Sequence, residues 1–589
     1  MDWIIRFILE GEHMKFFYPY CKKYKRYILW AIISVGLSVV AEMLQPTLMS
    51  KVIDNGIANL DFKYIIVYGI FMTLLAFIAI ALGISNIYSS ATASQGFAAE
   101  LRKDLFAHIQ NFSFSNIERF STSSLITRIT NDVNTIQMTF LLMLRMLLRA
   151  PITLIFTFVM ITIIDSQMAL IVLAVIPILI LIIYFITYVS MPRFLKMQAM
   201  IDKMNVTVQE ELTNIRLVKS FVREDFEKQK FNRVSNELQQ KTINAFHLAI
   251  IAFPAMLFIL NITTLLVWWF GGNKFLTGNI EIGKLVAFIT YIFNILFSIM
   301  MVSFVILFIV RSKASFKRIK EVLDEKADIT NIDNAKTDKI KIESLTFDNV
   351  SFKYDINAEE YALKDISFTA KKGEIIAIIG STSSSKSTLV QLIPRFFNAT
   401  RGSILINGTN INDYDLETLR NSIGFVMQKN ILFSETIEEN IKWGKPNATQ
   451  QEIIEACKAA QAHEFIMAMP DKYQTELGQM GVNVSGGQKQ RLCIARAMIK
   501  QPEILILDDS TSAVDTTTEA QIYKSFHSAL KDSIKIIIAQ RVSSVKDTDK
   551  IIILDSGQIA GMGTHEQLLE SNKIYQDIYQ SQNRSIKSN

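Results

Sequence analysis

The chain has 589 residues, of which half are hydrophobic and only 20% are charged. With a mean hydropathy of +0.26, this composition excludes an ordinary soluble protein, because so much apolar surface requires lipid around part of the chain. The net charge of +6 is small for the length and the sequence has no long run of Lys or Arg, so nucleic acid is not expected as a partner. The three cysteines are scattered and lack the spacing of a metal site, which indicates a reducing compartment: Cys21, Cys457 and Cys493.

A short apolar segment, residues 3–9, opens the chain and is followed by a basic cluster at residues 22–26. A signal peptide would place its charges first and end in small residues, so this segment does not fit one. We expect an interfacial helix on the cytoplasmic leaflet. The positive-inside rule then places the N-terminus in the cytosol.

Six apolar segments are long enough to span a bilayer, which requires about 20 helical residues. Two polar but helical stretches, residues 91–135 and 193–244, are expected to extend into the cytosol between them. After residues 321–341, a polar linker, strands alternate with helices over residues 342–589, as in a mixed α/β domain. The spans are expected at residues 27–50, 64–89, 138–164, 168–189, 246–270 and 282–310.

Two groups of residues in the spans each allow a functional and a structural interpretation. One group shares a helical face and either lines an apolar substrate path or packs against helices or lipid: Phe293, Phe297, Met301, Phe304 and Phe308. The other group is ionisable near membrane depth, and either serves function or extends to a polar cavity or the headgroups: Glu42, Arg145 and Arg149.

A phosphate-binding loop is expected between a buried strand at residues 375–379 and a helix that begins at Ser387. Inward-pointing backbone N–H groups and the positive end of the helix suit a polyphosphate, and Lys386 adds a mobile positive charge. The spacing from Gly380 to Ser387 fits this motif. However, Ser385 stands where the loop needs a glycine with positive φ, so we expect local strain or a weaker cradle.

Polar residues also follow two other apolar strands, at residues 504–507 and 534–539. Asp508 ends the first of them and could hold Mg²⁺ through water beside the Ser387 hydroxyl. The carboxyl ends of parallel strands converge on one crevice. Four residues are therefore expected to share a site: Lys386, Asp508, Asp509 and Gln540.

Three further positions bear on a nucleotide. Gln428 follows a strand and could reach a metal-bound water, and Tyr354 could either stack on a purine or pack within its strand. Residues 485–488, SGGQ, offer a hydroxyl and backbone N–H groups at a helix start to a second anion. Because one nucleotide does not need two cradles, this segment is expected to cover a nucleotide that another subunit holds.

The motifs GSTSSSKST, MQ, VSGGQ, ILILDDSTSAVD and IAQR occur in the order found in the nucleotide-binding domain of ATP-binding cassette (ABC) transporters. With six spans before them, the chain resembles an ABC exporter half-transporter: a six-helix transmembrane domain over residues 1–320, then an α/β P-loop nucleotide-binding domain. The resemblance implies a multi-pass plasma-membrane protein with a cytoplasmic nucleotide-binding domain, and coupling helices near residues 113–123 and 210–216. It also implies ATP and Mg²⁺ as cofactors.

The resemblance assigns roles residue by residue. By this resemblance, the ATP that this chain holds would contact Tyr354, Gly380, Ser381, Thr382, Ser383, Ser384, Ser385, Lys386, Ser387, Thr388, Gln428 and Asp508. The Mg²⁺ that accompanies it would contact Ser387, Gln428 and Asp508. The partner's ATP would contact Ser485, Gly486, Gly487, Gln488 and Asp515. The two catalytic positions are Asp509 and Gln540.

Several positions depart from the family pattern on the ATP-holding side. Ser383 and Ser385 replace glycines, either by natural relaxation or by deliberate substitution, and Ser510 replaces a proline. Asp509 replaces a glutamate that acts as base, and it is one methylene shorter. Gln540 replaces a histidine and cannot carry a proton. The signature segment at residues 485–488 is intact.

This asymmetry leads to the hypothesis that the chain's own site is degenerate, while its signature completes the catalytic site of a different half-transporter. Independent drift in an active homodimeric drug or lipid exporter is the alternative, and a regulatory ABC protein with a nucleotide-gated pore is another. A membrane-anchored P-loop kinase is disfavoured, because the signature has no role there. The apolar spans suit a lipophilic small molecule, a lipid or a hydrophobic peptide as substrate, and only the resemblance gives an outward direction of transport.

Overall fold

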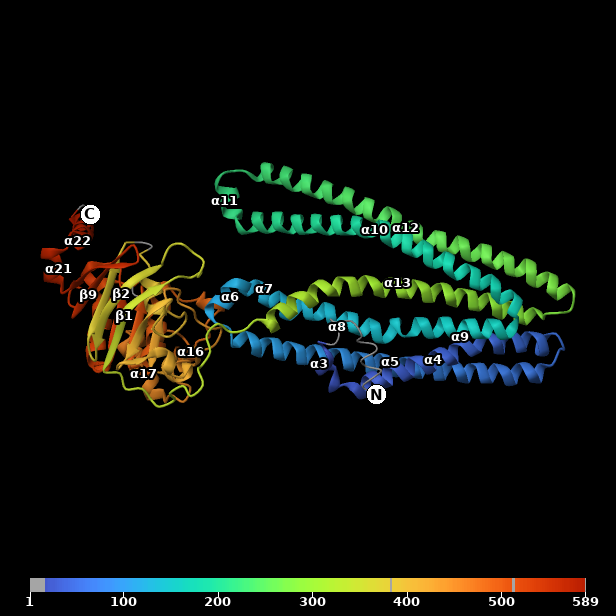
Figure 1. Ribbon diagram of the computed structural model, residues 1–589, viewed down its shortest axis with the longest axis horizontal. Helices are drawn as coiled ribbons and strands as arrows, with labels where there is room; N and C mark the ends of the chain where they lie inside the picture. Colours follow the sequence, from blue (N-terminus) through green and yellow to red (C-terminus); the bar gives the residue numbers. More distant parts are fainter. Residues whose placement is uncertain (1–15, 382–383, 511–513, 588–589) are drawn as a thin grey trace. The chain divides into compact units, whose positions relative to one another are not determined.

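A computed structural model describes residues 16–381, 384–510 and 514–587 of the chain (Figure 1). The predicted interfacial helix at residues 3–9 lies outside these residues, as do Thr382 and Ser383. The chain divides into two compact units. The first comprises the residues up to Gln110 together with Ser123–Asp324, and the second comprises Asn111–Thr122 and Glu325–Asn589.

The first unit is entirely helical. Six of its helices among the described residues are long and apolar enough to cross a membrane, which confirms the six-span prediction. One of them, α10, begins at a polar cap, where the Asp165 carboxylate accepts hydrogen bonds from the Gln167 and Met168 amides. Its elements are α3 (Tyr18–Lys22), α4 (Lys25–Lys51), η1 (Val52–Ile57), α5 (Phe62–Gln110), α7 (Thr122–Thr127), η2 (Arg128–Asp132), α8 (Val133–Leu142), η3 (Met143–Leu147), α9 (Arg149–Ile164), α10 (Ser166–Thr213), α11 (Ile215–Ser220), α12 (Glu224–Leu276) and α13 (Ile282–Asp324).

The ionisable and aromatic residues of the spans divide between internal contacts and exposed positions. Arg149 of α9 donates a hydrogen bond to Glu42 of α4, so this pair neutralises itself inside the bundle. On α13, Phe308 packs beside Val305, whereas Phe297 and Phe304 are 56% and 50% exposed on the unit. The helices of the chain itself therefore cover one end of the aromatic face and leave its middle open.

The second unit is built on two sheets. The larger has the order β10-β9-β3-β8-β7-β6, with β3 parallel to both β8 and β9 at its centre. The smaller is antiparallel, with the order β2-β1-β4-β5. The strands are β1 (Ser344–Phe352), β2 (Leu363–Lys371), β3 (Ile375–Gly380), β4 (Arg401–Ile406), β5 (Thr409–Asn410), β6 (Ile423–Val426), β7 (Ile504–Asp508), β8 (Ile534–Ile538), β9 (Lys550–Asp555) and β10 (Gln558–Gly563).

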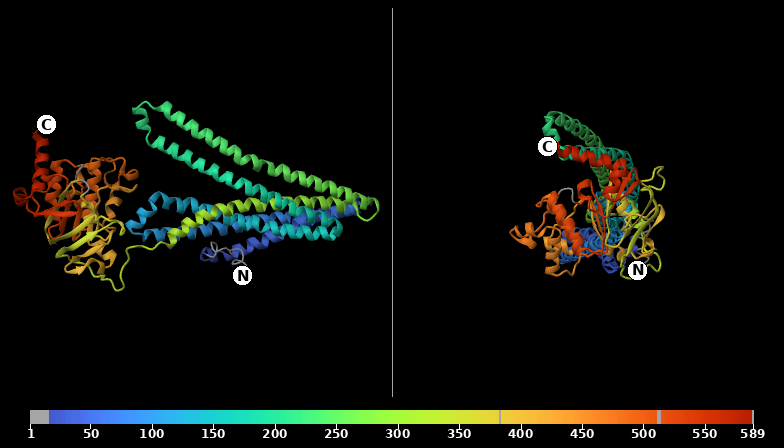
Figure 2. Two further views of the ribbon diagram at one scale, coloured as in Figure 1. Left: turned by 45° about the horizontal axis from the view of Figure 1, so that its top comes forward. Right: turned by 90° about the vertical axis from the view of Figure 1, so that its left-hand side faces the viewer.

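Helices pack on both faces of the larger sheet, whose central strands are fully buried (Figure 2). This burial explains why β3, β7 and β8 read as unbroken apolar runs. The helices are α14 (Lys386–Gln391), η4 (Ile411–Asp413), α15 (Leu416–Asn421), α16 (Ile437–Lys442), α17 (Gln450–Ala459), α18 (His463–Met467), η5 (Lys472–Gln474), η6 (Gln479–Gly481), α19 (Gly486–Met498), α20 (Thr516–Ala529), η7 (Val542–Ser544), α21 (His565–Ser571) and α22 (Lys573–Lys587).

One short helix from the first cytosolic excursion, α6 (Phe114–Phe120), belongs to the second unit. Its Phe114 ring lies 4.5 Å from the Phe396 ring and 6.3 Å from the Phe397 ring, between centroids. Arg119 donates to Glu325 at 3.0 Å. Helix α13 ends at Asp324. Glu325, which follows it, bonds Asn116 and Arg119 of α6.

Candidate nucleotide-binding site

The phosphate loop lies between β3 and α14, as expected. A Cβ atom at Gly380 would stand 2.1 Å from the Leu554 carbonyl oxygen of β9, so only glycine fits there. Ser385 has φ +64° and ψ +27°, the left-handed conformation that the sequence pattern assigns to a glycine. For a residue with a Cβ this costs about 1–2 kcal/mol. In the described part of the loop, Ser385 is therefore strained.

Lys386 points back into the loop. Its Nζ donates to the carbonyl oxygens of Gly380 at 3.0 Å and Ser381 at 2.7 Å, and to the buried Ser384 hydroxyl at 3.2 Å. Burial lowers the pKa of this ammonium, although the nearby carboxylates of Asp509 and Asp508 oppose the shift. Because the Lys386 ammonium is partly withdrawn from water, its interaction with a bound anion would be strongly favourable.

Asp508 ends β7 and is 3% exposed. The Ser387 hydroxyl donates to its Oδ1 at 2.8 Å. Burial raises the pKa of Asp508, with the neighbouring Asp509 charge adding to the effect. A buried carboxylate beside a hydroxyl is an all-oxygen donor pair that fits Mg²⁺, which takes few protein ligands beside phosphate oxygens and water. The described residues contain no group of three or more His, Cys, Asp or Glu that could hold a metal alone.

The two departing catalytic positions bond to each other. Gln540 Nε2 donates to Asp509 Oδ2 at 2.7 Å. Asp509 has φ +48°, and its backbone N–H bonds the Ile538 carbonyl at 3.2 Å. Burial raises the pKa of the Asp509 carboxyl, and the Gln540 amide partly offsets this. The Asp509 carboxylate, one methylene shorter than that of a glutamate, is therefore held by the Gln540 amide, which cannot accept a proton from it.

A cavity of about 470 Å³ joins these residues, a size typical of a ligand site. Residues of the phosphate loop, residues at the ends of strands, and Gln428 all line this cavity. Among the described residues that line it, none comes from the signature segment. The predicted lining residues are Gly380, Ser381, Ser384, Ser385, Lys386, Ser387, Thr388, Gln428, Asp508, Asp509 and Gln540.

Tyr354 lies beside the cavity but is not among its lining residues. Its hydroxyl pairs with the Thr388 hydroxyl at 2.9 Å, and its ring meets the Phe397 ring edge-on at 5.3 Å. The side chain is 56% exposed. It therefore has a face available for a base and is also fixed to α14, the helix that follows the phosphate loop.

Two lining residues of the cavity were not predicted, Ile578 and Gln582 of the C-terminal helix α22. Gln582 Nε2 donates to the Gln540 carbonyl at 2.7 Å, and its Oε1 accepts from the Val542 amide at 2.8 Å. One side-chain amide thus fixes the backbone of the segment that carries Gln540. A lone glutamine near the end of the chain gives no sequence signal for this role.

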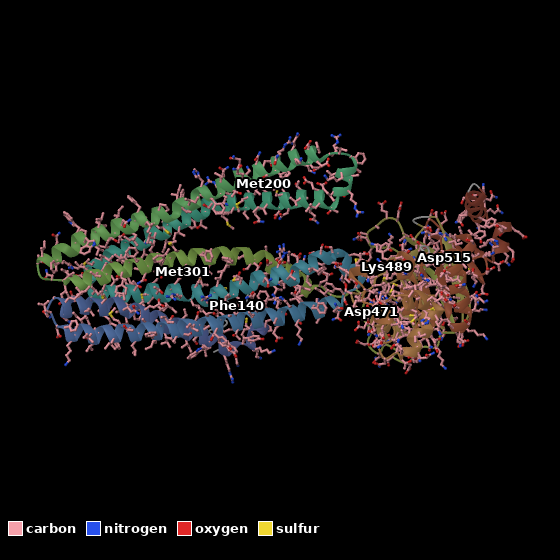
Figure 3. The ribbon with its side chains drawn as sticks, turned by 180° about the vertical axis from the view of Figure 1, so that it is seen from behind. Phe140, Met200, Met301, Asp471, Lys489 and Asp515 are labelled. Atoms are coloured by element: carbon pink, nitrogen blue, oxygen red, sulfur yellow. The ribbon has the colours of Figure 1, made fainter. Side chains whose placement is uncertain are left out.

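The signature segment lies at the start of α19, away from the cavity lining. Ser485 and Gln488 form a reciprocal capping box, with bonds of 3.3 and 2.9 Å between side chain and backbone. Because these side chains cap the helix, the groups left to an anion are the backbone N–H groups of Gly486 and Gly487. Asp515 caps α20 and accepts from the Thr518 amide at 2.9 Å, which lowers the pKa of its carboxyl. Figure 3 labels Asp515, and Lys489 in α19.

Sequence profiles match both halves of the chain. Residues 28–300 match the family model of the ABC transporter transmembrane region, and residues 363–512 match the family model described as ABC transporter. An uncharacterized ABC transporter ATP-binding protein of Bacillus subtilis, YfiB, is 39% identical over 94% of this chain and 96% of its own length. The chain belongs to the ABC transporter family.

Other relatives refine this assignment. A Staphylococcus aureus protein, named as a multidrug export ATP-binding/permease protein, is 34% identical to this ABC transporter over 97% of the chain and 99% of its own length. A bacterial Atm1-family ABC exporter solved with ATP bound superimposes with a TM-score of 0.82 at 25% identity, covering 95% of this chain and 99% of that one. The protein is therefore an ABC exporter half-transporter, a multi-pass membrane ATPase with a cytoplasmic nucleotide-binding domain.

Proposed function

We propose that this ABC transporter is one subunit of a heterodimeric exporter. Its own phosphate loop holds ATP but supports little hydrolysis, and its signature segment, residues 485–488, completes the productive site on a different half-transporter. The Gln540–Asp509 hydrogen bond of 2.7 Å carries this proposal. It joins the two positions that should activate water, and neither side chain can both reach and accept the proton as the family's glutamate and histidine do.

The remaining residues of the site support binding rather than turnover. Lys386 and the loop N–H groups suit the phosphates, Tyr354 suits the base, and Ser387 with Asp508 suits Mg²⁺. Gln428 lines the same cavity, and it would reach a metal-bound water there. When bound, Mg²⁺ would neutralise charge on the phosphates. Asp508 would hold it in place, which leaves Asp509 as the position where hydrolysis fails.

Export of a lipophilic compound from the cytoplasm or the inner leaflet is the activity we propose for the complex. The name of the Staphylococcus aureus relative supports a drug-like substrate, and the half-exposed Phe297 and Phe304 of α13 offer an apolar path. A lipid or hydrophobic peptide would meet the same surface. A homodimeric exporter is the second candidate, favoured by the intact signature and by the retained carboxylate of Asp509.

We also propose that α6 transmits closure of the nucleotide site to the spans. Phe114 contacts Phe397, Phe397 contacts Tyr354, and Tyr354 is hydrogen-bonded to Thr388 in α14. This line of packed side chains leads from the excursion to the phosphate loop. The second excursion turns at α11, within residues 214–223, where a coupling contact with the other subunit is proposed.

The test compares the purified chain alone with the chain co-purified with its companion. Alone, the protein should hydrolyse ATP far below about 1 s⁻¹, whereas the complex should exceed that rate. Repairing the site with Asp509→Glu and Gln540→His should raise the rate of the lone chain and change the rate of the complex less than about twofold. Lys386→Ala in the repaired lone chain is the control, because it should remove the gain. Brisk turnover by the unaltered lone chain would contradict the proposal and favour the homodimer.

A further inference from the structure

A pocket of about 420 Å³ lies between α10 and α12, far along the chain from the nucleotide site. Arg193 and Lys196 line it from α10, and Lys241, Asn244 and His247 line it from α12. Residues three apart share a helical face, so Arg193 and Lys196 lie on the same side of α10 and Lys241 and Asn244 on the same side of α12. The like charges of Arg193 and Lys196 repel each other weakly at this spacing, and a bound anion would relieve this repulsion.

The surroundings of this basic pocket do not neutralise it. None of its three Lys and Arg side chains forms an ion pair with another described residue. The nearest acidic residue on α12, Glu237, is bound to Lys203 at 3.1 Å, and Asp202 on α10 accepts from Gln198 at 3.2 Å. Nearer the membrane, neither helix has an acidic residue. The positive charge is therefore available to an anion from outside the chain.

The depth of the basic pocket matches the inner headgroup layer. Arg193 follows Ser166, the first residue of α10 on the outer side, by 27 positions, which is about 40 Å at 1.5 Å per residue. His247 precedes the outer end of α12, Leu276, by 29 positions, a similar distance. A bilayer with its headgroups is about 40–45 Å thick.

Aromatic residues support this depth. Tyr184 and Tyr188 stack on each other about one and a half to two and a half turns before Arg193, and both are more than two-thirds exposed. Exposed tyrosines are typical of the membrane interface. Below them, the Phe194 ring of α10 meets the Phe246 ring of α12 at 5.2 Å and holds the two helices together beside the pocket. Figure 3 labels Met200, one turn beyond Lys196 on α10.

We propose that this pocket binds the phosphate of an anionic phospholipid headgroup in the inner leaflet. Arg193 offers a planar fork to the phosphate oxygens, Lys196 and Lys241 offer point charges, and the Asn244 amide offers a neutral donor. Basic pockets between helices on the cytoplasmic side are suited to such headgroups. The inference stands independently of the asymmetry proposed for the nucleotide site.

Native mass spectrometry of the full chain, in buffer without nucleotide, tests the proposal with phosphatidylglycerol and phosphatidylcholine of equal acyl length. We expect phosphatidylglycerol to bind at least tenfold more tightly. The double variant Lys196→Gln/Lys241→Gln should weaken phosphatidylglycerol about thirtyfold and leave phosphatidylcholine unchanged, and Arg193→Gln alone should cost about fivefold. These substitutions lie on exposed helix faces, and a folded elution profile checks each variant.

The matched control is Lys228→Gln/Arg233→Gln, which removes the same charge from α12 about 12 Å or more further into the cytosol. It should change phosphatidylglycerol affinity less than twofold. An equal loss in the control, or an unchanged lipid preference in the pocket variants, would overturn the proposal. A third arm adds glycerol phosphate. Binding of this free headgroup as tight as that of the lipid would also overturn it, because the ligand would then be a soluble phosphate ester.

Discussion

The nucleotide-binding unit carries two half-sites that differ in how well local geometry suits their residues. In the signature half-site, Ser485 caps α19 with a reciprocal capping box, and none of residues 485–488 has a positive φ. In the phosphate-loop half-site, Ser385 and Asp509 both adopt positive φ. At Ser385, the family pattern has a glycine that would adopt this conformation without strain. The comparison teaches that a backbone can keep a left-handed conformation at a position where a serine stands in place of the glycine that would ease it.

The largest expected difference between the half-sites is catalytic. In a complex with the proposed companion half-transporter, Gly487→Asp should lower ATPase activity about 100-fold or more, because a carboxylate would repel the phosphates of the ATP that the companion holds and block backbone donors. Lys386→Ala, on the other half-site, should lower it less than about tenfold. Steady-state phosphate release measures both. If the two effects were reversed in size, the chain's own site would be the productive one.

Asp508→Asn should separate binding from stability. Without the carboxylate, Mg·ATP should no longer raise the melting temperature, a loss of about 2.7 kcal/mol at a hundredfold excess over Kd. The raised pKa of Asp508 means that its ionised form destabilises the nucleotide-free fold. The contribution of Asp508 to the free energy of unfolding is fully present below the pKa of the unfolded state, about 3.9, and is lost as pH rises through its pKa in the folded state.

Without nucleotide, the Asp508→Asn variant should therefore have a higher melting temperature than the parent at neutral pH. The difference in melting temperature should become smaller towards pH 4. Thermal scans across this range check the sign. Asp577→Asn, an exposed position on α22, is the control and should leave both properties unchanged. A variant that melts lower than the parent at pH 7.5 would contradict the burial argument.

Relief of strain gives a smaller effect. Ser385→Gly should recover about 1 kcal/mol of loop strain and tighten ATP several-fold, because the backbone no longer resists the left-handed conformation. Ser381→Gly makes the same chemical change in the same loop at a residue without positive φ, and it should leave ATP affinity unchanged. Equilibrium titration with a fluorescent ATP analogue compares the two. Equal gains would show that strain at Ser385 does not limit binding.

The smallest effect concerns α22. Gln582→Ala removes two hydrogen bonds to the segment 540–542, worth about 1 kcal/mol each, and amide exchange at Val542 should accelerate about tenfold. Gln580→Ala, an exposed glutamine on the same helix, should leave exchange unchanged. Hydrogen–deuterium exchange of the nucleotide-free full chain reports this locally. Unchanged protection at Val542 would mean that other contacts fix the segment.

Much of the architecture could be predicted because long apolar runs and strand-end motifs carry their own signals. The six spans, the phosphate loop and the convergence of Lys386, Asp508 and Asp509 all follow from periodicity and parallel-strand geometry. The end of α13 at Asp324 and the place of α6 in the second unit could not, since they depend on side chains distant in sequence. The roles assigned to individual site residues remain predictions.

The sequence by itself determined that the chain crosses a membrane six times and carries an ABC ATPase domain with an altered phosphate-loop half-site, because these features are local in the chain. Only the tertiary structure decided that Gln540 bonds Asp509, that Gln582 holds the backbone around Gln540, and that cations from α10 and α12 enclose one pocket. Such contacts join residues tens of positions apart. They depend on how strands and helices pack, which no local pattern records.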